Sequence, residues 1–69
     1  MPFYEALAKV INAGVPMRRE CWPEGEYIIH TYIMRSRVFK GNDKELKVWS
    51  PNEEELVSND WKVYTGKIF

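Results

Sequence analysis

The segment from Glu26 to Met34 most constrains the fold, because it is apolar on both of the faces that a β-strand presents. It is rich in the aromatic and β-branched residues that favour strands. Its apolar side chains alternate between the two faces, with Tyr27, Ile29 and Ile33 on one face and Ile28, Tyr32 and Met34 on the other. We expect this segment to be the central strand of a sheet. A single helix covers only one face of a sheet, so the second face should need another subunit or a ligand.

The remaining sequence predicts one helix and several shorter strands around this central strand. Apolar residues at helical spacing indicate a helix over residues 3–13, ended by Gly14. Extended segments are expected at 15–21, 35–40, 46–49 and 60–64, with turns at 24–25 and 41–43; segment 35–40 either continues the central strand or forms its neighbour. The predicted fold is a single α+β domain over residues 1–69. An N-terminal helix packs on a small antiparallel sheet of four or five strands, with a short helical turn before the last strand.

The helical turn is predicted within the segment from Trp49 to Trp61. Ser50 is expected to be its N-cap, Pro51 is tolerated at the first helical position, and Glu53 stands where a capping box needs an acidic residue. Asn59 can adopt the left-handed conformation that ends a helix. This segment therefore should join two strands through a rigid connection.

Size and charge exclude several classes of protein. A chain of 69 residues has a marginal core, so help from a partner subunit is plausible. The single cysteine, Cys21, excludes an internal disulfide, leaves no zinc cluster and fits a reducing cytoplasmic setting. The 10 basic and 10 acidic residues cancel, which disfavours DNA, RNA and anionic membranes as partners, and no apolar run approaches the length that spans a bilayer. No cofactor or metal is predicted.

Catalysis has little support in the sequence. The one histidine, His30, lies in the middle of the predicted central strand, where histidines usually pack rather than react. Cys21 is more typical of a small apolar side chain than of a nucleophile. Three consecutive glutamates at 53–55 complement the dipole of a first helical turn without acting as acid and base. We expect a protein that is not an enzyme; a nucleotide hydrolase using His30 with a carboxylate is the catalytic alternative.

The residues that could bind a ligand are cationic, aromatic and acidic. Arg18 and Arg19 offer cations for phosphate, Trp22 and Trp49 offer flat surfaces for a base, and Asp60 offers a carboxylate for sugar hydroxyls. These are the parts of a nucleotide site. The alternative is that all three tryptophans belong to the core, and composition alone does not decide between the two.

Two blocks of the sequence resemble a known family. The opening block is Phe3-x-x-Ala6-Leu7, then Gly14, Arg18 or Arg19, and Trp22. The closing block is Trp49-x-Pro51, Glu55, Leu56-Val57 and Asp60-Trp61. In order and spacing they resemble the small phage proteins that antagonise the bacterial Thoeris defence system by sequestering its signal molecule.

The resemblance implies a homo-oligomer, a tetramer or a dimer, in the host cytoplasm with ligand pockets between subunits. It implies binding of cyclised ADP-ribose signals, and in some relatives of cyclic oligonucleotides, without cleavage. Trp22 and Trp49 would stack on a base, and Asn59 and Asp60 would lie near the pocket. Trp61 is expected to be core for a separate reason, because it follows Asp60 into the last strand. The alternative is a small interaction module whose exposed aromatic side chains dock a host or phage protein.

Overall fold

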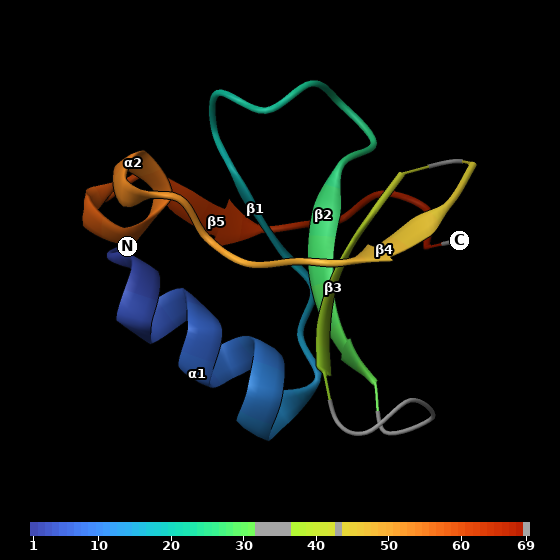
Figure 1. Cartoon of the computed structure of the whole chain (residues 1–69), viewed down its shortest axis with the longest axis horizontal. Helices are drawn as coiled ribbons and strands as arrows, with labels where there is room; N and C mark the ends of the chain where they lie inside the picture. The colour runs from blue at the N-terminus through green and yellow to red at the C-terminus, as the bar shows by residue number, and fades with distance from the viewer. Residues whose placement is uncertain (32–36, 43, 69) are drawn as a thin grey trace.

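A computed structural model describes residues 1–31, 37–42 and 44–68 as a helix packed on a five-stranded antiparallel sheet (Figure 1). The elements in chain order are α1 (Phe3–Ala13), β1 (Met17–Arg19), β2 (Tyr27–Thr31), β3 (Arg37–Gly41), β4 (Leu46–Val48), α2 (Glu53–Val57) and β5 (Trp61–Val63). The strand order is β4-β3-β2-β1-β5, so the last strand returns to pair with the first. The predicted α+β class, the strand number and the short helix before the last strand are confirmed.

Helix α1 begins and ends where the sequence predicts. Gly14 has a φ of 67°, which a residue with a side chain rarely adopts, and the Val15 amide donates a hydrogen bond to the Lys9 carbonyl at 3.2 Å. Ala6 and Val10 are fully buried, and α1 contacts β1, β2, β5 and α2. The helix therefore covers one face of the sheet, called here the helix face.

The opposite face of the sheet is covered by the C-terminal part of the chain. The Tyr27 ring stacks on the Tyr64 ring at a centroid distance of 4.6 Å, and both side chains are buried. The ring of Tyr27 lies across Gly41, where a Cβ would come within 3.0 Å of it. The expectation that the second face needs another subunit or a ligand is therefore wrong at Tyr27, because residues after β5 supply the cover. Ile29 on the same face is half-buried, and residues 32–34, which the expectation also named, lie outside the described residues.

The cap of α2 differs from the prediction by two residues. Asn52, not Ser50, is the N-cap: its side-chain oxygen accepts from the Glu55 amide at 2.8 Å, and the Glu55 carboxylate accepts from the Asn52 amide at 2.9 Å. Both Ser50-x-x-Glu53 and Asn52-x-x-Glu55 fit a capping box. The box formed by Asn52 and Glu55 is selected because it buries Glu55. In that position the backbone carbonyl of Glu55 accepts a hydrogen bond from the Trp61 indole N–H at 3.3 Å.

The helix also ends before the residue expected to end it. Its last residue is Val57, and Ser58 follows in an extended conformation with its hydroxyl donating to the Glu55 carbonyl at 2.8 Å. Asn59 lies beyond this point. No helix in the described ranges is long and apolar enough to cross a membrane.

Candidate functional site

The three tryptophans converge on the helix face. Trp22 and Trp61 have centroids 5.2 Å apart, Trp49 and Trp61 6.1 Å, and Trp22 and Trp49 6.4 Å, each pair meeting edge to face. Trp61 is 2% exposed and Trp22 is 9% exposed, whereas Trp49 is half-buried. Trp61 is therefore core, as expected, and Trp49 is the outermost ring of the cluster.

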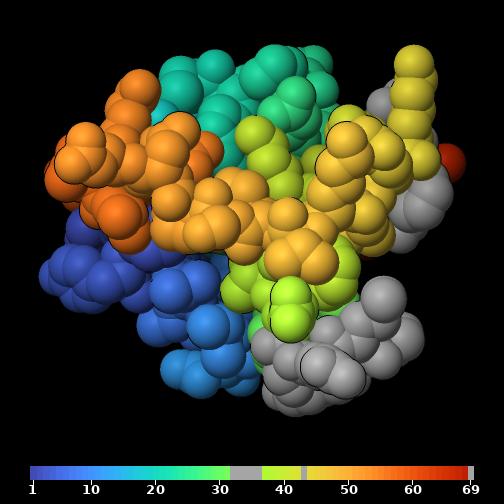
Figure 2. All heavy atoms as spheres, in the orientation of Figure 1, coloured from blue at the N-terminus to red at the C-terminus, as the bar shows by residue number. Residues whose placement is uncertain are grey.

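An open groove lies beside Trp49. It has a volume of about 340 Å³ and is lined by Glu26, Lys40, Gly41, Asn42, Glu45, Lys47, Val48 and Trp49. Figure 2 shows the yellow-to-orange segment that contains β4 and α2 crossing the visible face, below the teal turn that joins β1 to β2. Of the six predicted site residues, only Trp49 contributes to this lining.

Lys40 lines this groove, although the sequence did not identify it as a site residue. Its ammonium lies 4.0 Å from the centroid of the Trp22 ring and 3.2 Å from the Glu26 carboxylate. The ammonium therefore occupies a flat face of the ring that was expected to stack on a base. The alternation of β3 could have revealed it, because Lys40 follows Val38 at the period of two and shares the helix face with it.

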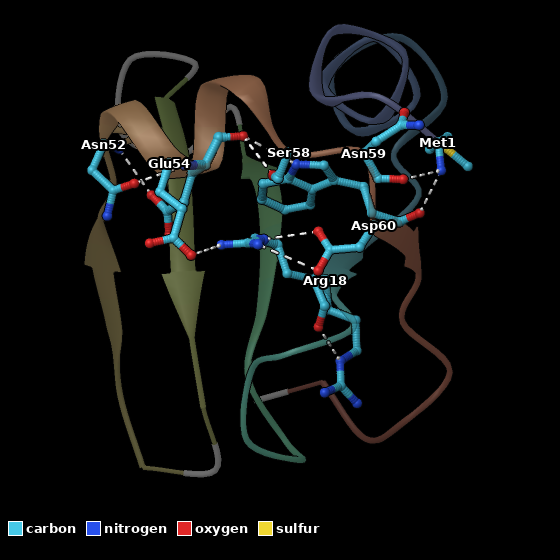
Figure 3. A network of polar contacts seen from close by, with 10 residues as sticks. Met1, Arg18, Asn52, Glu54, Ser58, Asn59 and Asp60 are labelled. Carbon is cyan, nitrogen blue, oxygen red and sulfur yellow. Dashed lines mark hydrogen bonds and ion pairs between the residues drawn. The ribbon is translucent and has the colours of Figure 1, made fainter.

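Arg19 and Asp60 form an ion pair beneath α2. The Arg19 Nε lies 2.9 Å from Asp60 Oδ1, its Nη2 lies 3.3 Å from Asp60 Oδ2, and its Nη1 lies 3.3 Å from Glu54 (Figure 3). The hydrogen bonds from Arg19 hold the pKa of Asp60 below its ordinary value, against the opposing effect of burial. Hydrogen bonding to Asp60 raises the pKa of Arg19 in turn. The pair thus joins β1, β5 and α2, and the Arg19 guanidinium is already engaged within the protein.

Arg18 lies on the opposite face of the sheet from Arg19, since adjacent residues of a strand point to opposite faces. Its guanidinium donates to the backbone carbonyls of Arg19 and Trp22, and Figure 3 shows it directed away from Asp60. It lines a second open groove of about 560 Å³. The other residues of that groove are Glu24, Gly25, Lys62, Val63, Tyr64, Thr65 and Gly66.

Asn59 and Asp60 lie beside the N-terminal amine. That amine donates to the Asn59 carbonyl at 3.2 Å and to the Trp61 carbonyl at 3.1 Å (Figure 3). Neither Asn59 nor Asp60 lines the groove beside Trp49. The structure therefore distributes the predicted site residues over three places: the tryptophan cluster, the Arg19–Asp60 pair with the N-terminus, and the groove at Arg18.

Residues 1–64 match the Tad2-like family, described as the Thoeris anti-defense 2-like domain. No curated protein matches the chain at a significant level. The matched range includes all three tryptophans and both grooves except Thr65 and Gly66, and it agrees with the resemblance of the opening and closing blocks. The chain therefore belongs to the Tad2-like family of Thoeris anti-defence domains.

Proposed function

We propose that this protein acts against Thoeris by binding a cyclic nucleotide signal in the groove beside Trp49 and withholding it without cleavage. Family membership supports the anti-defence role. The observation that carries the binding proposal is the half-buried Trp49 ring at the edge of a groove that also holds two lysines, Lys40 and Lys47. The ligand proposed is a cyclised ADP-ribose, with cyclic oligonucleotides as related ligands, and the place of action is the host cytoplasm during infection.

The groove supplies the chemistry that a nucleotide requires. A base stacked on an aromatic ring is stabilised by about 1–3 kcal/mol, and Trp49 offers such a ring next to cations for phosphate. Asn42 ties the ends of the β3–β4 turn, because its amide donates to the Glu45 carbonyl at 3.0 Å and its side-chain oxygen accepts from the Glu45 amide at 3.0 Å. This part of the wall is thus held in place before a ligand arrives, which favours tight capture.

The lining favours capture over turnover. Its two carboxylates are both paired with lysines, Glu26 with Lys40 at 3.2 Å and Glu45 with Lys47 at 3.3 Å. General acid and base catalysis needs one proton donor and one acceptor held at the scissile bond. Among the lining residues in the described ranges there is no serine, cysteine or histidine to act as nucleophile or base.

A homo-oligomer, a tetramer or a dimer, is part of the proposal. The groove is partly open to solvent in one copy, so a neighbouring subunit would enclose a ligand more fully. Apolar side chains are available for such contacts, since Val48 is 57% exposed, Leu56 49% and Val57 82%. Sedimentation of the purified protein would measure its mass, and a monomer at micromolar concentration would contradict this part of the proposal.

The test of signal capture uses cyclic ADP-ribose as the probe. The protein is incubated with the probe, freed of unbound nucleotide and heat-denatured, and the released nucleotide is identified by mass spectrometry. We expect intact probe from the unaltered protein and none from Trp49→Ala, with both proteins folded by circular dichroism. Cleaved probe, or no retention of it, would contradict the proposal.

Tyr4→Ala is the matched control for Trp49→Ala. Tyr4 is 77% exposed on α1, and it is the one exposed aromatic side chain within the described ranges. We expect its removal to leave capture unchanged. A pull-down tests the alternative of an interaction module. That alternative is favoured if the pull-down recovers one protein in stoichiometric amount, and if Tyr4→Ala rather than Trp49→Ala abolishes its recovery.

A further inference from the structure

Lys40 is the less exposed of the two lysines that line the groove beside Trp49. It stands on β3 opposite Ile28 of β2, which is fully buried, and its own side chain is 32% exposed. Its ammonium contacts the Trp22 ring on one side and the Glu26 carboxylate on another. A lysine in this position has lost part of its water shell, so an anion near it is less screened than one at the surface.

We propose that Lys40 is the residue that recognises an anionic phosphate group of the ligand, and that Glu26 and the Trp22 ring hold its ammonium until the phosphate displaces them. The inference rests on the proposed function, because it needs a phosphate-bearing ligand in the groove beside Trp49. It assigns a role to two residues, Lys40 and Glu26, that lie in the lining but have no other function in the fold described above.

Lys47, the other lysine of the groove, is less suited to this role. Its side chain is 73% exposed and its partner Glu45 is 55% exposed. Exposed pairs of this kind contribute about 0–1 kcal/mol because water and salt screen them. Lys40 is therefore expected to contribute more of the affinity for a phosphate than Lys47 does.

The turn between β1 and β2 places both partners of Lys40 around its ammonium. The Trp22 amide donates to the Arg19 carbonyl at 3.2 Å, and the Glu26 amide donates to the Pro23 carbonyl at 3.3 Å. Gly25 has a φ of 92°, which lets the chain reverse within these few residues. Trp22 and Glu26 thus approach the same ammonium from one short segment.

Glu26 must compete with any phosphate that approaches Lys40. Two anions near one ammonium repel each other, so the carboxylate lowers the affinity of the unaltered groove for a phosphate. When Lys40 turns to the phosphate, it also uncovers the face of Trp22 that it occupies in this structure. The ring expected from the sequence to stack on a base becomes accessible only after that movement.

The experiment measures the affinity for cyclic ADP-ribose by titration calorimetry at two salt concentrations. We expect Lys40→Met to weaken binding at least about tenfold and to reduce its salt dependence, since a charge-assisted contact is lost. Lys40→Arg should retain most of the affinity. Glu26→Gln should tighten binding a few-fold, about threefold, because the competing charge is removed. Lys47→Met is the matched control, with a change of about twofold or less.

The opposite signs of the two substitutions separate recognition from a structural role. Equal weakening by Lys40→Met and Glu26→Gln would overturn the inference, because loss of a structural ion pair has the same effect from either side. If Lys40→Met fails to fold by circular dichroism, Glu26→Gln decides alone, and unchanged or weaker binding overturns the inference. Binding that survives Lys40→Met overturns it while the proposed function stands. An unaltered protein that binds no nucleotide overturns both.

Discussion

The two faces of the sheet are both covered, but by different means. On the helix face, Trp61 packs against Phe3 of α1 and against the other two tryptophans, and its indole N–H donates to the Glu55 carbonyl of α2. On the opposite face, Tyr27 is covered by Tyr64 from the segment after β5. The helix face is thus held by several elements far apart in sequence, whereas on the opposite face the stacked pair of Tyr27 and Tyr64 lies beside the buried Phe39 of β3.

Within the helix face, the tryptophan cluster contains both a ring that stabilises the fold and a ring that borders a groove. Trp61 has an exposure of 2%, so it is closed to any ligand, while Trp49 in the same cluster borders a groove. The innermost ring stabilises the fold and the outermost ring remains available.

Trp61→Ala should destabilise the protein far more than Tyr64→Ala. Removing a large buried ring costs about 3–5 kcal/mol, which is comparable to the whole free energy of unfolding of so small a domain. Tyr64 loses fewer neighbours, and we expect about 2 kcal/mol for its removal. Urea denaturation followed by circular dichroism measures both values. Equal losses in the free energy of unfolding would show that the two faces of the sheet contribute equally to stability.

Asp60→Asn should have the next largest effect. It leaves the buried Arg19 guanidinium with Glu54 as its remaining carboxylate, and we expect a loss of about 2–3 kcal/mol in the free energy of unfolding. Asp60→Leu also removes the carboxylate that pairs with Arg19, but it places no amide group in that position. A loss below about 0.5 kcal/mol would place this pair among ordinary surface ion pairs.

The same pair predicts a pH dependence. The pKa of Asp60 is lowered in the folded protein, so its contribution is fully present above the ordinary carboxylate pKa of about 4 and is lost as pH falls through the folded value. The free energy of unfolding should therefore fall below about pH 4 in the unaltered protein, and less steeply in Asp60→Asn. Glu5→Gln, on the exposed side of α1, is the control and should leave the pH profile unchanged.

The smallest effect distinguishes the two possible caps of α2. Asn52→Ala removes the observed cap and should cost about 1 kcal/mol, whereas Ser50→Ala should cost close to none. Thermal unfolding of both variants measures the difference. A larger loss of stability for Ser50→Ala than for Asn52→Ala would show that Ser50 is the N-cap, as the sequence predicts.

Much of the fold could be predicted because it depends on local patterns. Helix α1 has apolar residues at one spacing and a glycine at its end, and alternation identifies the strands and their turns. The cap of α2 could not be predicted, since two capping boxes overlap in the sequence and the choice depends on the contact between Glu55 and Trp61. Lys40 could not be predicted as a site residue because its partners, Trp22 and Glu26, come from the turn between β1 and β2. They reach its ammonium only when β2 pairs with β3.

The sequence by itself determined the α+β class, the extent of α1 and the positions of the strands along the chain, because periodicity and turn residues act over short distances. Tertiary structure alone decided which ring remains available. It buried Trp22 beneath Lys40, engaged Arg19 with Asp60, and left Trp49 at a groove. Those outcomes depend on strand register and on the return of β5 to β1, which brings Arg19 to Asp60, 41 positions away along the chain.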